Sequence, residues 1–380
     1  MQINLKRLGY IFLIMPFIIP AYFYNFKTVA TIIKLFKCII FFIFLIMILT
    51  WKNRISKPGK YILMYQSFVF LIGIYNKYFS FDIIVSIFLC ILFEYGLSKK
   101  DNYFLEGLYK ILEFLIYINL ISVLVFPNGM YNNGVYDANW LLGYKNPMIR
   151  LFIPVCAIGL LISYKKYNKF NIRSKLLIII SIITVILVDS STGIVGMLVF
   201  ISMLLATRSK FWREKITLFR GFIVYIISNF FVITGTAERY ISFFIEGILN
   251  RSMTFTGRTT IWEKTLELIR EHLFIGIGDC PSEMMEAIIV GPHPHNYFLY
   301  ILLQSGIIGI IILLLGIKSA DKCVKISNDK KACNIMVAAL LSFYIMGITE
   351  SITAAILMYP LYIIIGNMDK INYSNNEVKN

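Results

Sequence analysis

Long runs of hydrophobic residues alternate along the chain with short polar stretches that contain most of its lysines and arginines. A helix needs about 20 apolar residues to cross the hydrocarbon core of a bilayer, and these runs reach that length or come close to it. The pattern predicts about twelve transmembrane helices, at residues 8–24, 32–50, 61–76, 78–97, 107–126, 148–164, 175–188, 191–207, 216–234, 296–316, 333–349 and 352–367. We therefore expect an all-α polytopic membrane protein.

The composition agrees with a membrane protein and excludes several other classes. Hydrophobic residues make up 58% and charged residues 15% of the 380 residues, whereas a soluble domain usually carries about 25% charged residues. A soluble enzyme, a disordered chain and a nucleic-acid-binding domain are therefore excluded. The net charge of +16 is explained by the lysine and arginine excess that cytoplasmic loops carry.

The distribution of basic residues predicts the orientation of the helices. If the N-terminus lies in the cytoplasm, most lysines and arginines of the loops also fall on the cytoplasmic side, as the positive-inside rule requires. Both termini are then cytoplasmic. The first run contains Pro16 and Pro20 and lacks a small-residue cleavage site, so we expect an uncleaved and kinked first span.

Two of the predicted outer loops are long. One covers residues 127–147, and the other covers residues 235–295, which is far beyond the usual length of a connection and is typical of a functional segment. The chain then divides into residues 1–234 with helices one to nine, the outer loop 235–295 with short helices, and residues 296–380 with helices ten to twelve and a cytoplasmic tail. A transporter of two six-helix halves would instead place its long connection in the cytoplasm, after the sixth helix.

The outer loop 235–295 combines histidine with arginine. Its histidines, the only ones in the sequence, are His272, His293 and His295. Histidine is the side chain best suited to proton transfer near neutral pH. Its arginines are Arg239, Arg251, Arg258 and Arg270, although outer loops are usually poor in basic residues. The combination favours a site that binds an anion and moves a proton.

Arg258 is the first candidate for binding the anion. Thr260 and Glu263 have the spacing of a capping box, which predicts a helix that begins at Ile261 with Trp262 on its apolar face. Arg258 would then lie just before the positively polarised end of that helix, where an arginine fork could clamp a diphosphate. The alternative is that Arg258 pairs with a nearby carboxylate or with a lipid phosphate.

His295 is the candidate for proton transfer. It stands next to Asn296, which is suited to cap the N-terminus of the tenth helix. The positive end of that helix should keep the imidazole neutral, the form that a general base needs. One alternative is a histidine that only hydrogen-bonds the loop together. Another is zinc bound by His293 and His295 with a third ligand from His272, Asp279 or Glu283; Pro294 and the absence of an H-E-x-x-H motif argue against it, so we expect no metal and no cofactor.

Three further residues lie in other segments of the predicted outer side. Trp140 belongs to a loop of aromatic and amide side chains, a composition that suits sugar stacking and equally an interfacial aromatic belt. Arg150 lies inside an apolar span, where an arginine usually faces a cavity or an anion, or snorkels to a headgroup. Glu350, in the turn between the last two spans, could orient a base or an acceptor.

Three motifs occur in a particular order in the second half of the chain. They are G-R-x-x-x-W at residues 257–262, H-x-x-x-G-I-G at residues 272–278 and H-N-Y-F-L-Y-I-L-L-Q-S-G at residues 295–306. With the polytopic architecture, they resemble the O-antigen ligase and polysaccharide polymerase superfamily, and most of all its Wzy-type capsular polysaccharide polymerases. Residues 142–146, L-G-Y-K-N, also resemble the L-G-x-K-N element of Gram-positive polymerases and contain Lys145 and Asn146.

The resemblance implies a GT-C-like glycosyltransferase at the outer face of the bacterial cytoplasmic membrane, with an undecaprenyl-type (polyprenyl) diphosphate glycan as donor. Arg258 matches the family arginine that holds the diphosphate, and His295 matches the histidine that acts on the acceptor hydroxyl. Where many relatives have an S-R element, this chain has Ser190-Ser191, so the second diphosphate arginine is open among Arg150, Arg239 and Arg251, with Arg150 first. The residues expected to support substrate or sugar binding are His293, Asn296, Trp262, Trp140, Lys145, Asn146 and Glu350.

The function that we predict is a polysaccharide polymerase of capsule or surface polysaccharide synthesis. It would join lipid-linked repeat units within the lipid bilayer. We expect a flippase and a chain-length regulator as protein partners, and no binding of nucleic acid. Two alternatives stay open: a ligase that transfers a finished glycan to another acceptor, and, from a different class, a lipid-linked oligosaccharide flippase or other transporter.

Overall fold

The computed structural model describes residues 5–234, 256–352 and 357–373. Every named element in this part of the chain is a helix. The helices are α1 (Leu5–Ile14), η1 (Met15–Phe17), η2 (Ala21–Asn25), α2 (Lys27–Leu49), α3 (Lys57–Tyr75), α4 (Phe81–Ser98), α5 (Tyr103–Val125), α6 (Lys145–Tyr167), α7 (Ile172–Leu187), α8 (Ser191–Ala206), α9 (Lys210–Lys215), α10 (Leu218–Ile233), α12 (Thr256–Glu271), α13 (Ser282–Ile289), α14 (Tyr297–Ile326), α15 (Lys330–Met346), α16 (Met358–Gly366) and η3 (Met368–Lys370).

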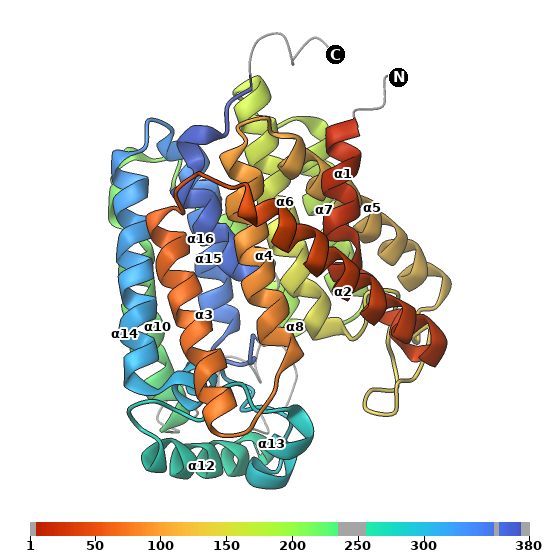
Figure 1. The fold of residues 1–380 in the computed structure, drawn as a ribbon, viewed down its shortest axis with the longest axis vertical. Coiled ribbons are helices and arrows are strands. Elements are labelled where there is room, and N and C mark those ends of the chain that lie inside the picture. The colour runs from red at the N-terminus through yellow and green to blue at the C-terminus, as the bar shows by residue number, and fades with distance from the viewer. Residues whose placement is uncertain (1–4, 235–255, 353–356, 374–380) are drawn as a thin grey trace.

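The long helices form a bundle, and α12 and α13 lie across one of its ends (Figure 1). Inside the bundle α3 packs along α14, α8 along α15, and α16 between α3 and α4. The start of α1 and the last described residues after α16 lie at the other end of the bundle (Figure 1). The first and last described residues are thus on one side of the bundle, opposite α12 and α13.

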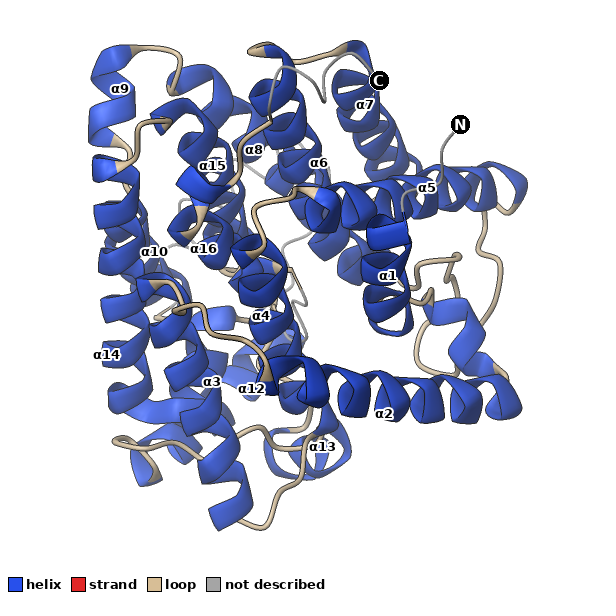
Figure 2. Cartoon of the chain, turned by 45° about the horizontal axis from the view of Figure 1, so that its top comes forward, coloured by secondary structure: helices blue, strands red, loops and turns tan. Residues whose placement is uncertain are grey.

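An all-α membrane protein, as predicted from the apolar runs, is supported by five helices that are long and apolar enough to cross a bilayer: α2, α4, α5, α6 and α14. Helices overlap all the predicted segments, but several are too short to meet the same standard, so the number of crossings stays a prediction. Helix α2 extends from the side of the bundle (Figure 2), and only 17% of its most apolar stretch is buried. Its exposed hydrophobic side chains suit contact with lipid.

Two helix boundaries differ from the sequence prediction. The first predicted span, 8–24, is interrupted: α1 ends at Ile14, and two short 3₁₀ helices follow. Pro16 and Pro20 cannot donate the backbone hydrogen bonds that a continuous α-helix needs. The tenth helix is longer than the predicted segment 296–316, because α14 continues to Ile326 across a break at Gly306, whose φ is 56°.

The break at Gly306 joins α14 to the H-x-x-x-G-I-G segment. The N–H groups of Ile277 and Gly278 donate to the carbonyls of Leu303 and Gln304, at 2.8 and 2.9 Å. Gly276 has a φ of +70°, and a Cβ there would come within 2.5 Å of the α14 backbone. The glycines of this motif therefore allow two backbones to touch, and the contact attaches the segment after α12 to the bundle.

A separate hydrophobic cluster holds α12 and α13 against α14. Its buried members are Ile261, Trp262, Ile269, Ile277, Met285, Ile289, Leu299 and Leu303. Trp262 and Ile269 therefore lie on the apolar face of α12, as predicted. Leu273, at the next position of the helical spacing, is 39% exposed because α12 ends before it, at Glu271.

Candidate functional site

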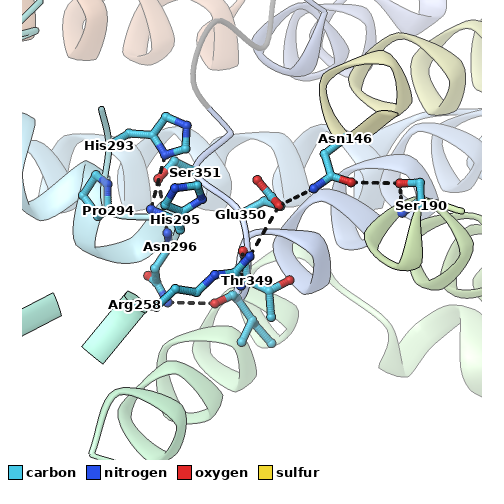
Figure 3. Close-up of polar contacts among 12 residues, drawn as sticks. Asn146, Ser190, Arg258, His293, Pro294, His295, Asn296, Thr349, Glu350 and Ser351 are labelled. Carbon is cyan, nitrogen blue, oxygen red and sulfur yellow. Dashed lines mark hydrogen bonds and ion pairs between the residues drawn. The ribbon is translucent and has the colours of Figure 1, made fainter. Parts of the chain in front are cut away.

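Four segments that are far apart in the sequence meet next to Arg258 (Figure 3). They are the first turn of α12, the loop 291–296 before α14, the turn 347–351 after α15, and the N-terminus of α6. They bring together Arg258, His293, His295, Glu350, Asn146 and Arg150, all of them candidates from the sequence. The turn 349–351 lies at the centre of these contacts.

Arg258 binds that turn from α12. Its Nη1 donates to the carbonyl of Thr349 at 3.0 Å, and its Nη2 lies 3.9 Å from Oε1 of Glu350. The predicted helix start at Ile261 is wrong, because α12 begins at Thr256. Thr260 and Glu263 both point to solvent as residues inside the helix. Arg258 therefore lies in the first turn of α12, still among the free N–H groups of a helix N-terminus.

Arg150 binds the same turn from α6. Its Nη2 donates to the carbonyl of Ser351 at 2.8 Å, a residue that is 201 positions away in the sequence. The side chain thus reaches the turn 349–351 from within the bundle. Arg150 and Arg258 hold the carbonyls on either side of Glu350.

Glu350 continues a chain of polar contacts toward α8. Its Oε1 accepts from Nδ2 of Asn146 at 2.7 Å, and Oδ1 of Asn146 accepts from the hydroxyl of Ser190 at 3.0 Å. Burial raises the pKa of Glu350, while Arg150, Arg258 and Asn146 oppose the shift. The neighbouring Lys145 does not join this chain, because its Nζ donates to the carbonyl of Asp189.

His293 and His295 lie against each other beside the turn. Their ring centroids are 4.2 Å apart, and the N–H of His295 donates to Nδ1 of His293 at 3.4 Å. His295 has a φ of +50°, a left-handed backbone that is unfavourable for a residue with a Cβ. Its Nδ1 is buried and has no hydrogen-bond partner in the described part of the chain.

Both imidazoles are neutral near pH 7. Burial, with Arg258 and Arg150, lowers the pKa of His295 to about 4. Burial, with His295, Arg150 and Arg258, lowers the pKa of His293 to about 3. From the sequence we expected the N-terminal end of the next helix to keep the His295 imidazole neutral. In the structure, burial and the two arginines are the main causes.

Two of the predicted supporting residues fix the histidine loop. Asn296 caps α14, as predicted, by accepting from the N–H of Leu299 at 3.0 Å. Its Nδ2 donates to Oδ1 of Asn229 and to the carbonyl of Ile348, so it also ties the loop to α10 and to the central turn. Nε1 of Trp262 donates to the carbonyl of Pro294 at 2.8 Å. Both side chains are buried and position His295 from within the protein.

Other sequence candidates do not join the site. Trp140 is only 4% exposed, and its Nε1 donates to the carbonyl of Phe126, so its ring has no free face for a sugar. Arg239 and Arg251 lie outside the described residues. Within the ranges that the structure describes, no three His, Cys, Asp or Glu side chains form a group that could hold a metal ion.

Sequence reasoning missed a carboxylate near His293. Asp279 accepts hydrogen bonds from the side chains of Ser80, Tyr300 and Gln304, and it lines a polar cavity that His293 also lines. The sequence pointed to Asp279 only as a zinc ligand. Its position directly after the G-I-G of residues 276–278 was a signal that could have been used, because those glycines attach it to α14.

The comparison with known families covers part of the chain that contributes to this site. Residues 176–314 match the model of a family described as O-Antigen ligase, and no curated protein matches the chain. The matched part contains Arg258, His293 and His295, but not Arg150, Asn146 or Glu350. The match supports the ligase and polymerase superfamily, whose members are glycosyltransferase-like enzymes acting on lipid-linked glycans in membranes, and does not separate a ligase from a polymerase.

Proposed function

We propose that this protein is a polysaccharide polymerase, which joins polyprenyl-diphosphate-linked repeat units at the outer face of the bacterial cytoplasmic membrane. The observation that carries the proposal is the convergence of Arg258, Arg150 and His295 around the turn 349–351. Two guanidinium groups and a neutral imidazole are the groups that a glycosyl transfer from a diphosphate donor needs. The family match supports the same class of reaction.

The arginines would bind the diphosphate of the donor. Guanidinium groups bind phosphate oxygens through two parallel hydrogen bonds, and the N-terminus of α12 adds backbone N–H groups beside Arg258. Charge stabilisation of a leaving diphosphate by such groups is worth several kcal/mol of barrier. This arrangement lets the leaving group depart without a metal ion, so we propose a metal-independent reaction.

His295 would act as the general base. The hydroxyl oxygen of the acceptor attacks C1 of the donor sugar and forms the new C1–O bond, and its proton passes to the neutral imidazole. The bond between C1 and the diphosphate oxygen breaks, and the electron pair leaves with the polyprenyl diphosphate. The low pKa of the imidazole keeps it free to accept that proton at neutral pH.

A ligase is the second candidate function. The specific observation in its favour is the description of the matched family, O-Antigen ligase. A ligase would use the same diphosphate site but pass a finished glycan to an acceptor of another kind. For the polymerase we propose a flippase and a chain-length regulator as partners.

The experiment that separates these functions uses purified protein in nanodiscs and lipid-linked repeat units as the sole glycan. A polymerase forms a ladder of products on a gel, and a ligase leaves the repeat units unjoined. We expect a ladder from the wild type, also in the presence of EDTA, and none from His295→Ala. His272→Ala is the matched control, because His272 lies in the same segment 235–295 and its hydrogen bonds to Leu268, Ile269 and Gly276 involve its backbone alone; it should form the ladder. A wild type that forms no ladder would contradict the polymerase.

A further inference from the structure

A polar cavity of about 170 Å³ lies beside the histidine loop, and the diphosphate chemistry proposed above does not use it. Side chains from α3, α4, α13, α14 and α16 line it, together with Asp279, Pro292 and His293. A single water needs ~10–15 Å³ on this scale of volume. The space is therefore large enough for a ligand with the size of a sugar ring.

The charged residues around this cavity are acidic, whereas those around the turn 349–351 include two arginines. Asp82 and Asp279 line it, and no lysine or arginine is among its described lining residues. A diphosphate or a uronic acid would be repelled by the two carboxylates. A ligand that carries hydroxyl groups and no charge would be favoured, because a carboxylate accepts hydrogen bonds from hydroxyls and does so strongly.

Asp279 is held in one orientation by three side chains from two segments. The hydroxyl of Ser80, before α4, donates to its Oδ2. The hydroxyl of Tyr300 donates to Oδ1 at 2.9 Å, and Nε2 of Gln304 donates to the same atom. A carboxylate has about four acceptor positions, so the fixed Asp279 keeps capacity for a ligand hydroxyl.

Aromatic side chains form another wall of the cavity. Tyr359 lines it as a partly buried side chain, and its hydroxyl oxygen is 2.9 Å from that of the buried Tyr297. Tyrosine combines a flat apolar face with a polar hydroxyl. Sugars have the matching surfaces, an apolar face of C–H groups and an edge of hydroxyls.

The cavity lies next to the proposed base. His293 lines it, and the centroid of the His293 ring is 4.2 Å from that of the His295 ring. A sugar in the cavity would therefore hold its hydroxyl groups close to the histidine pair.

We propose that this cavity binds an uncharged sugar of the acceptor glycan, with the Asp279 carboxylate accepting hydrogen bonds from its hydroxyls. The identity of the ligand as an acceptor rests on the proposed function. The substrate class is a neutral or N-acetylated sugar beside the attacking hydroxyl, and a uronic acid is excluded from that position. Asp279 would be a substrate-binding residue, and Tyr300 a positioning residue that acts through it.

The kinetic test compares Asp279→Asn with Tyr300→Phe in the nanodisc ladder assay. Asp279→Asn keeps the shape of the side chain and removes its charge. We expect the acceptor KM to rise about tenfold or more while kcat changes less than about twofold, since a contact made equally in the ground and transition states affects KM alone. Tyr300→Phe should raise the KM by a smaller factor. Asp137→Asn, an exposed carboxylate of the loop 127–147, is the control and should leave the KM unchanged.

A binding test needs no turnover and keeps this inference separate from the proposed function. Saturation-transfer NMR is recorded on the nanodisc protein with methyl glucoside or methyl glucuronide as the probe. We expect a signal from the glucoside, none from the glucuronide, and loss of at least half of the glucoside signal in Asp279→Asn. Equal signals from both sugars, no signal from either, or an unchanged signal in Asp279→Asn would overturn the sugar site.

The two tests fail in different ways. If the wild type forms no ladder but binds the glucoside through Asp279, the polymerase is wrong and a sugar site remains. If the ladder forms and Asp279→Asn has a normal acceptor KM, the polymerase stands and this cavity is not its acceptor site. Thermal unfolding of each variant shows whether a loss comes from misfolding, and Tyr300→Phe, which removes one hydroxyl, covers the case in which Asp279→Asn does not fold.

Discussion

Arg258 and Glu350 lie opposite each other with 3.9 Å between Nη2 and Oε1, which is longer than a hydrogen bond. The two groups attract each other by charge but share no hydrogen bond of normal length. Glu350 is also bonded to Asn146, and Arg258 to the carbonyl of Thr349. The guanidinium is therefore positioned by the backbone of the turn and only loosely paired with the carboxylate, so an incoming diphosphate can compete for it.

Arg258→Lys should reduce polymer formation more than the preserved charge would suggest. Lysine loses the planar fork that binds two phosphate oxygens and the bond to Thr349. We expect kcat/KM for the donor to fall at least about tenfold, measured in the ladder assay at several donor concentrations. Arg270→Lys, an exposed site on the same helix α12, is the control. An Arg258→Lys enzyme with wild-type kcat/KM would remove the arginine from the diphosphate site.

Glu350→Gln should strengthen the binding of the donor. The amide can still accept a hydrogen bond from Asn146 but no longer competes with the diphosphate for Arg258 and Arg150. We expect the donor KM to fall by about threefold, because an exchange of one partner for another in a partly buried pair is worth on the order of 1 kcal/mol. A higher donor KM would show that Glu350 holds the arginines in place.

The acidic limb of the pH profile should lie well below the ordinary pKa of histidine. Because the pKa of His295 is lowered to about 4, the base stays neutral as the pH falls through 6.5, and kcat/KM should decline only as the pH approaches about 4. Arg258→Gln removes one cause of the shift, so the residual activity of that variant should decline at a higher pH, below 6.5 because burial remains. A wild-type decline centred near 6.5 would contradict a buried base.

The same pKa shifts predict that the protein is less stable in acid. His293 and His295 take up protons near pH 6.5 in the unfolded chain, but only near pH 3 and 4 in the folded protein. The unfolded state therefore binds more protons between these values, and folding stability falls as the pH is lowered through this window. Thermal unfolding between pH 7 and 4 would show a falling Tm, with a smaller fall in His293→Gln.

Gly276→Ala should destabilise the fold through its contact with α14. Gly134 serves as the control, because it also has a positive φ, +82°, but a Cβ there has nothing within 4 Å. Both substitutions carry the backbone cost of about 1–2 kcal/mol, and Gly276→Ala adds an overlap with the backbone of Gln304 and Ser305 that costs about 1–3 kcal/mol more. Thermal unfolding in detergent measures both. Equal losses in the two variants would mean that the contact is not tight.

The helices could be predicted from the sequence because the hydrophobic pattern is a local property. Runs such as 107–126 and 148–164 lie inside α5 and α6 with errors of a few residues. The prediction failed where a local signal has two meanings. Thr260 and Glu263 have the spacing of a capping box, but that spacing also occurs inside an exposed helix face, and α12 begins at Thr256.

The site could be predicted only in part, because its contacts are long-range. Arg258 and His295 lie in motifs and were found, while their meeting at the turn 349–351 depends on the packing of α6, α12 and α15. Trp140 looked like a sugar-binding residue by composition, and only the structure reveals that its ring is covered. The role of Asp279 could not be predicted because it depends on a hydrogen bond from Ser80, which is 199 positions away in the sequence.

The most direct test of the account is an experimental structure of the protein with undecaprenyl diphosphate. We expect the diphosphate between Arg150 and Arg258 at the N-terminus of α12, within hydrogen-bonding distance of both guanidinium groups, and His295 on the side that faces the cavity of Asp279. A diphosphate bound elsewhere, with Arg258 still on Thr349 and Arg150 still on Ser351, would contradict the proposed site and the reaction derived from it.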